Sequence, residues 1–128
     1  MKLLLDTHVF LWLMYDSRKL SRLAYETCKD SNNSLYLSVA SMWEMQIKHQ
    51  LGKLELSVSL EEMIEEECQT NGLQILPIEL KHISALYNFP FYHKDPFDRI
   101  IIAQSVIDNV HLVSADKVFE KYPVKLLW

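Results

Sequence analysis

The sequence predicts an α/β fold built around a mostly parallel sheet. Two observations support this prediction: short apolar runs alternate with longer helical patterns along the whole chain, and turn or cap residues separate them. A sheet of this kind is covered by helices on both faces. The chain has 128 residues, of which 49% are apolar, so one continuous core is feasible and we expect a single domain over residues 1–128.

Five apolar runs are strand candidates because each is too brief for a helix. In chain order they are "KLLLD" (2–6), "LYLS" (35–38), "LQILPI" (73–78), "HLVSAD" (111–116) and "VKLLW" (124–128). Helical patterns lie between them, at about 7–15, 18–31, 38–51, 59–71, 79–87 and 96–108. The clearest boundaries are those of 59–71, where Ser59 and Glu62 match a capping box and "NG" at 71–72 ends the pattern.

Composition argues against several functional classes. Thirteen basic and 17 acidic residues give a net charge of −4, which is not typical of a protein that coats nucleic acid non-specifically. The apolar start is interrupted by Asp6 and His8, so we expect mature protein with no signal peptide and no membrane span. Cys28 and Cys68 form no CxxC pair, which favours reduced thiols and a cytoplasmic location. The five histidines lack zinc-site spacing.

Two acids follow predicted strands. Asp6 ends the first strand and Asp116 follows "HLVSA", and each is also well placed to cap the helical segment after it. The carboxyl ends of parallel strands meet at one crevice, where such sheets bind ligands. Capping and a shared acidic site are therefore both open for these residues.

Glu44 is predicted to lie on a buried helix face. The apolar residues of the helix at 38–51 share one narrow sector of the helical wheel: Ala40, Trp43, Ile47 and Leu51. Glu44 falls inside that sector, and burying an unpaired carboxylate costs several kcal/mol, roughly. It therefore needs a basic partner, a proton or a metal ion. A structural salt bridge is an equally good explanation, although Lys48 points to another sector of the wheel.

The stretch "HKDPFDR" at 93–99 contains two more acids. Asp95 as N-cap, Pro96 at the first helical position and Asp98 in the first turn are all explained by helix initiation. The helix that follows is apolar on several sides, so its amino end should pack near the crevice. Oxygen ligands from several elements suit Mg²⁺ or Mn²⁺ rather than zinc. Without Asp6, Glu44, Asp98 and Asp116, the remaining charges balance at 13 basic and 13 acidic.

Four segments in this order resemble a known family. "LLLDTHVFLW", "SVASMWEMQIKHQLGKL", "HKDPFDRIIIAQS" and "LVSADKVFEKY" are similar to PIN-domain ribonucleases, specifically the VapC-type toxins of bacterial toxin–antitoxin pairs. The resemblance implies a three-layer α/β/α PIN-like fold with a central parallel sheet of four to five strands. It also implies Mg²⁺- or Mn²⁺-dependent RNA cleavage, a homodimer, and neutralisation by a small cognate antitoxin.

The resemblance assigns residues one by one. The four family acids correspond to Asp6, Glu44, Asp98 and Asp116, which would serve as catalytic metal ligands. Supporting roles fall on Thr7 and Ser114, where a hydroxyl often assists the site, and on Asp95, which belongs to a variant motif and is not an obligatory ligand. The implied activity is that of a metal-dependent endoribonuclease, in which metal-activated water hydrolyses the phosphodiester.

Substrate contacts are assigned from charge and position alone. Lys48 follows Glu44 and Arg99 follows Asp98, so both are candidate RNA contacts, with ordinary surface charge as the alternative. Three aromatic residues near the acids are interpreted as core or interface rather than as base-stacking platforms: Trp12, Trp43 and Phe97.

Three other functions remain as alternatives. A haloacid-dehalogenase-like phosphoryl-transfer enzyme also begins with a strand and an aspartate, but it needs a second acid where this chain has His8. A receiver-like signalling domain would need an acid beside Asp6 and an active-site lysine, for which Lys117 is a poor substitute. A PIN-like protein that binds its partner without cutting is disfavoured by the complete set of acids.

Overall fold

A five-stranded parallel sheet organises the computed structural model, which describes residues 1–128. The strands are β1 (Lys2–Leu5), β2 (Ser34–Ser38), β3 (Gln74–Leu76), β4 (His111–Val113) and β5 (Lys125–Leu127). Their order in the sheet is β3-β2-β1-β4-β5, and every neighbouring pair is parallel. The predicted parallel α/β fold is therefore confirmed, with five strands at the positions of the five apolar runs.

Each predicted helical pattern contains a helix. They are α1 (Thr7–Tyr15), α2 (Arg22–Lys29), α3 (Val39–Gln50), α4 (Leu60–Asn71), α5 (Leu80–Ala85) and α6 (Pro96–Ile107), with short 3₁₀ helices η1 (Ser17–Lys19), η2 (Leu86–Asn88) and η3 (Lys117–Lys121). The pattern at 18–31 is divided, because Ser21 accepts a hydrogen bond from the Ala24 amide and starts α2 as a separate helix. Ser59 caps α4, and Gly72 ends it with a φ of 69°, as predicted.

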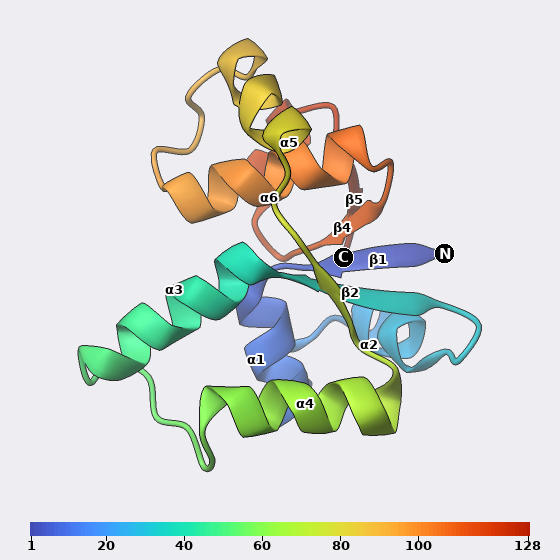
Figure 1. Cartoon of the computed structure of the whole chain (residues 1–128). Coiled ribbons are helices and arrows are strands. Elements are labelled where there is room, and N and C mark those ends of the chain that lie inside the picture. The colour runs from blue at the N-terminus through green and yellow to red at the C-terminus, as the bar shows by residue number, and fades with distance from the viewer.

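The helices cover the sheet on both faces (Figure 1). α1, α2 and α4 lie on one face, and α5 and α6 lie on the other. Successive residues of β1 supply both cores, because side chains alternate across a strand: Leu3 and Leu5 join the core beside α1, whereas Leu4 packs against Ile101 of α6. Three layers, α/β/α, are the result.

The structure contains no disulfide, as the cysteine spacing led us to expect. Cys28 and Cys68 are unpaired, and burial raises the pKa of the Cys28 thiol to about 11, which makes it a poor nucleophile. No helix combines the length and apolar character needed to cross a membrane.

Candidate active site

Asp6 and Asp116 lie at the carboxyl ends of neighbouring strands. Asp6 directly follows β1, and Asp116 lies three residues after β4, which pairs with β1 in parallel. The Asp6 side chain makes no capping bond to α1, and its Oδ2 instead accepts a hydrogen bond from Ser114 Oγ at 2.7 Å. Ser114 Oγ also accepts from the Asp116 amide at 3.1 Å. The buried Ser114 therefore connects both acids, and capping does not account for the Asp6 carboxylate.

Glu44 reaches the same region from α3, and it is buried as predicted, with 8% exposure. Its Oε1 accepts a hydrogen bond from Thr7 Oγ1 at 2.8 Å, and Thr7 Oγ1 also lies 2.9 Å from the Oγ of Ser41. Thr7 follows Asp6 in the chain, so this contact joins the start of α1 to α3. The sequence analysis did not identify Ser41.

Two details of the predicted α3 surface are wrong. Trp43 and Leu51 are 64% and 62% exposed, so they do not belong to the buried face. Lys48 does pair with Glu44, since its Nζ lies 2.8 Å from Glu44 Oε2. Residues four apart are neighbours on a helix, and the flexible lysine stem lets the ammonium group reach back to the carboxylate.

Asp95 and Asp98 have different surroundings at the start of α6. Asp95 Oδ1 accepts a hydrogen bond from the Phe97 amide at 2.8 Å, and Pro96 occupies the first turn, so the predicted cap is confirmed. Asp98 is partly buried. Burial, and then the negative charges of Asp95, Asp6 and Glu44, raise the pKa of Asp98 to about 7 against a smaller opposing effect of His93.

The pKa of Asp6 is also raised above its ordinary value. Burial is the main cause, the hydrogen bond from Ser114 opposes it, and the charge of Glu44 adds to the increase. Asp6, Glu44 and Asp98 thus influence one another electrostatically although they come from three different elements. Burial is the largest cause of both raised pKa values, so the carboxyls of Asp6 and Asp98 ionise less readily in the folded chain than free carboxyls do.

His93 holds Asp116 in place, a role that the sequence analysis did not predict. The buried His93 Nε2 lies 2.7 Å from Asp116 Oδ2, and its ring stacks on Phe119 with centroids 4.5 Å apart. The Tyr122 hydroxyl accepts from the His93 amide at 2.8 Å. Asp116 Oδ1 meanwhile accepts from the Val118 amide at 2.9 Å and caps η3. Both Asp116 oxygens are therefore anchored, and a lone histidine gives no sequence signal for this arrangement.

Arg99 is a structural residue, and its prediction as an RNA contact is corrected. The side chain is buried, and the guanidinium donates hydrogen bonds to the carbonyls of Pro90, Leu86 and Phe89 at 2.9, 3.1 and 3.1 Å. It also lies 3.8 Å from the centroid of the Phe91 ring. These contacts fasten the loop before α6 to the helix and leave the guanidinium unavailable to a phosphate.

Comparison with known proteins identifies the family. Residues 3–125 match the family described as PIN domain. The chain belongs to the PIN-domain family. PIN domains are generally nucleases, and those nucleases generally use divalent metal ions. No curated protein sequence matches the chain.

Solved structures share this PIN fold at low sequence identity. A chain of VapBC2 from Rickettsia felis bound to a DNA fragment from their promoter has a TM-score of 0.73 and 16% identity, and the match covers 99% of this chain and 98% of that chain. FitAcB from Neisseria gonorrhoeae has a TM-score of 0.67 at 16% identity, covering 98% and 96%. A toxin–antitoxin complex from Klebsiella pneumoniae has a TM-score of 0.62 and 16% identity, and the match covers 98% of this chain and 95% of that chain.

The acids of this PIN domain have the chemistry that a hard divalent cation requires. All the candidate ligands are carboxylate oxygens, and Asp6 and Asp98 have raised pKa values that a bound cation would lower. Glu44 and Asp116 are held by Lys48 and His93, and the structure contains no group of three His, Cys, Asp or Glu side chains arranged to hold an ion. The donor set fits Mg²⁺ or Mn²⁺, with side-chain movement needed to bring the ligands together.

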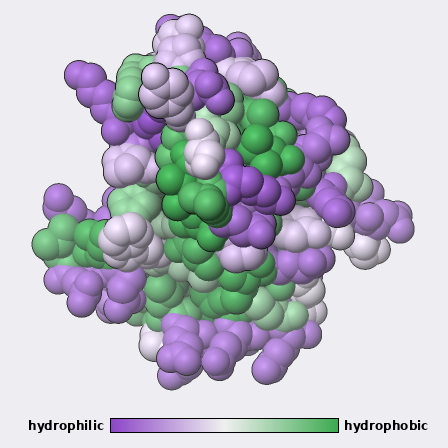
Figure 2. Space-filling model, turned by 45° about the horizontal axis from the view of Figure 1, so that its top comes forward, coloured by the Kyte–Doolittle hydropathy of each residue, from purple (hydrophilic) through white to green (hydrophobic).

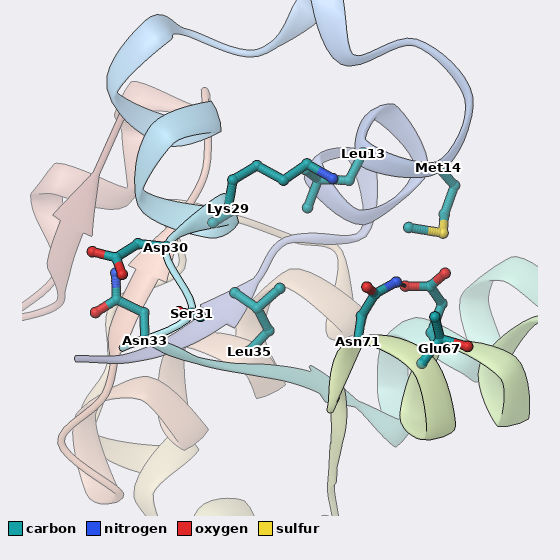
Figure 3. Close-up of a pocket in the computed structure, with 11 residues that line it drawn as sticks. Leu13, Met14, Lys29, Asp30, Ser31, Asn33, Leu35, Glu67 and Asn71 are labelled. Atoms are coloured by element: carbon teal, nitrogen blue, oxygen red, sulfur yellow. Dashed lines mark hydrogen bonds between the residues drawn. The ribbon is translucent and has the colours of Figure 1, made fainter.

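Two hollows lie at different ends of the parallel strands in the PIN domain. One, of about 320 Å³, is lined by Asp6, His8, Trp12, Ala115 and Asp116. Another, of about 310 Å³, lies between α1, α2 and α4 near the start of β2 (Figure 3). The polar groups of the second hollow are partly paired with one another, as in the 2.9 Å hydrogen bond from Asn71 to Glu67. Because it lies at the amino end of β2, away from the acids, it is not the candidate active site.

Proposed function

We propose that this PIN domain is a metal-dependent endoribonuclease and the VapC-type toxin of a toxin–antitoxin pair. The observation that supports this proposal is the half-buried carboxyl of Asp98, whose pKa is raised to about 7 first by burial and then by the negative charges of Asp95, Asp6 and Glu44. The order of the acids along the chain, the PIN-domain match and the likeness to toxin–antitoxin structures all agree with it.

In this proposal Asp6, Glu44, Asp98 and Asp116 would hold Mg²⁺ or Mn²⁺. When bound, such an ion lowers the pKa of a water molecule and stabilises negative charge on phosphoryl oxygens. The protein positions its own acids: Ser114 orients Asp6, Thr7 orients Glu44, and His93 orients Asp116. Asp95 acts through the helix start that presents Asp98. Lys48 is a candidate contact to the RNA phosphates.

Replacement of Asp6 by asparagine tests the activity. Asp6→Asn keeps the shape of the side chain and removes its charge, so cleavage of defined tRNA and mRNA pools with Mg²⁺ or Mn²⁺ should fall by about 100-fold or more. Glu66→Gln, at an exposed position of α4, is the matched control and should cleave like the unchanged protein. Cleavage that survives both Asp6→Asn and EDTA would contradict the proposal.

The phosphoryl-transfer and receiver-like alternatives are less well supported. The position two residues after Asp6 is His8, and Lys117 is exposed at the start of η3. Neither supplies the group that those families need, and the PIN-domain match covers residues 3–125. A trapped phospho-aspartate at Asp6 would be the result that favours phosphoryl transfer.

An apolar hollow with an acidic rim supports the antitoxin partner. It measures about 420 Å³ and lies between α3, α4 and β3, with Met42, Leu60, Ile64 and Ile75 beside Glu61 and Glu65. Figure 2 shows hydrophobic side chains gathered across the middle of one face, between hydrophilic ones. A basic amphipathic segment of a small antitoxin fits this combination of apolar floor and negative rim.

The antitoxin assignment is tested by co-purification. The small protein encoded next to this chain should bind it, and Ile75→Lys should weaken the complex because Ile75 is half-exposed in the hollow. Leu23→Lys, at a similarly exposed position of α2, is the control and should leave the complex intact. Equal effects of both substitutions would place the antitoxin elsewhere.

The proposed homodimer has a candidate surface on α5 and η2. Leu80, Ile83 and Tyr87 follow one another at helical spacing, and all three are exposed, Tyr87 at 95%. Exposed apolar residues that gather at helical spacing are typical of protein–protein contacts.

A further inference from the structure

The hollow beside Asp6 and Asp116 has an aromatic wall that the proposed chemistry does not use. Its lining combines the two carboxylates with His8, Trp12 and Ala115. His8 and Trp12 are four residues apart on α1, so their side chains project from the same face of the helix. Their ring centroids are 6.0 Å apart, with the planes inclined at 46°. The wall therefore begins two residues after Asp6.

The aromatic surface continues beyond this hollow. The rings of Trp12 and Trp128 are 6.0 Å apart at 56°, which makes a row of three rings from His8 to Trp128. Trp128 lines a neighbouring hollow of about 320 Å³ together with Ala115 and Lys117. Ala115 lines both hollows, and the second one places Trp128 near the ammonium group of Lys117 and the carboxylate of Glu120.

We propose that the hollow formed by Asp6, His8, Trp12, Ala115 and Asp116 binds an unpaired base of the RNA substrate, stacked on Trp12. The proposal rests on the proposed function and specifies which part of the substrate the site holds. It goes beyond the interpretation of Trp12 as a core or interface residue, because Trp12 packs against the core and also lines the hollow.

Size and position favour a base over a longer segment. A volume of about 320 Å³ is at the lower end of the roughly 300–1,000 Å³ of small-molecule sites. Single-stranded RNA is recognised by stacking its splayed bases on aromatic rings. A base is joined to its phosphate through one sugar, so a phosphodiester attracted by a cation that Asp6 and Asp116 would hold brings an adjacent base to this wall. Lys117 in the neighbouring hollow offers a contact for the next phosphate.

Indole NMR signals test the contact directly. The chain has three tryptophans, and their side-chain ¹H–¹⁵N signals can be assigned with single Trp→Phe variants. In the inactive Asp98→Asn protein, a short single-stranded RNA should shift the Trp12 signal, and an abasic nucleotide moved along the RNA should abolish the shift at one position. If the RNA leaves Trp12 unmoved, or if only a basic antitoxin peptide shifts it, the proposal is wrong.

Kinetics separate the base contact from a structural role of Trp12. His8→Ala and Trp12→Leu should raise KM for RNA about 5- to 100-fold with little change in kcat, as expected for the loss of one stacked base. Trp12→Phe should retain most of the affinity, and Tyr25→Leu, at an exposed aromatic residue of α2, is the control without effect. His8 is exposed, so its variant stays informative if Trp12→Leu unfolds.

The outcomes distinguish this proposal from the proposed function. Efficient RNA cleavage with an unchanged KM in both His8→Ala and Trp12→Leu overturns the base site and leaves the ribonuclease assignment standing. Absence of cleavage in the unchanged protein, together with a Trp12 signal that responds to RNA, overturns the ribonuclease assignment and supports the base site.

Discussion

Ionisation of Asp98 lowers the free energy of unfolding of the metal-free protein. Its ordinary pKa of 3.8 rises to about 7 in the folded chain, first through burial and then through Asp95, Asp6 and Glu44. The folded state therefore binds this proton more tightly than the unfolded state. Stability contributed by the protonated form is present at pH 4 and is lost as pH rises towards 7. An uncompensated charge at this residue is consistent with a site shaped for a cation.

Asp98→Asn should therefore stabilise the metal-free protein at pH 8, because asparagine carries no charge to bury. After allowance for solvent screening of a partly exposed group, we expect a gain of about 1–2 kcal/mol in the free energy of unfolding. The gain should disappear near pH 4, and urea denaturation in EDTA at both pH values measures it. Asp95→Ala, which removes the N-cap, should instead lose about 1 kcal/mol. Lower stability of Asp98→Asn at pH 8 would contradict this account.

At the scale of the element, α3 carries both the Glu44 carboxylate and the Lys48 ammonium group that neutralises it. Glu44 and Lys48 pair at 2.8 Å, so a cation that binds Glu44 must compete with the lysine ammonium. Lys48→Met should tighten Mn²⁺ binding about two- to fivefold, as expected for a partly exposed ion pair. Electron paramagnetic resonance of free Mn²⁺ measures the change, with Lys53→Met as the control for loss of charge alone. Equal effects of the two substitutions would show that the pair does not compete with the metal.

The sequence predicted elements best where local chemistry defines them. Asp95, Pro96 and the apolar run that follows mark the start of α6 without reference to the rest of the chain. The buried face of α3 was predicted less well. A helical wheel finds an apolar sector, but it does not reveal which face of the helix packs against the rest of the fold: Ala40, Glu44 and Met45 are buried, whereas Trp43 and Leu51 are exposed to solvent. The role of His93 was missed because its partner, Asp116, is 23 residues away in the chain. Arg99 was misassigned because it donates to backbone carbonyls, which leave no pattern in the sequence.

At the scale of the whole molecule, the parallel sheet was predictable and the strand order was not. Alternating strands and helices imply parallel pairing, but nothing local states that β1 lies between β2 and β4. The gathering of acids depends on that order, since β1 and β4 must be neighbours for Ser114 to reach Asp6. The acids themselves were candidates from local pattern, namely strand ends, a buried helix face and a helix start, and the family resemblance then assigned all four to one site.

The outer surface of α5 and η2 provides the test of assembly. α5 packs against α6 and leaves Leu80, Ile83 and Tyr87 exposed, so a second copy placed about a two-fold axis would bury the same residues from both chains. Ile83→Glu puts two like charges at the centre of that contact and should convert the proposed dimer to a monomer in light scattering after size exclusion. Leu23→Glu, an equally exposed site on α2, should leave the dimer intact. A monomeric unchanged protein, or an Ile83→Glu variant that stays dimeric, would assign this apolar stripe to a different partner.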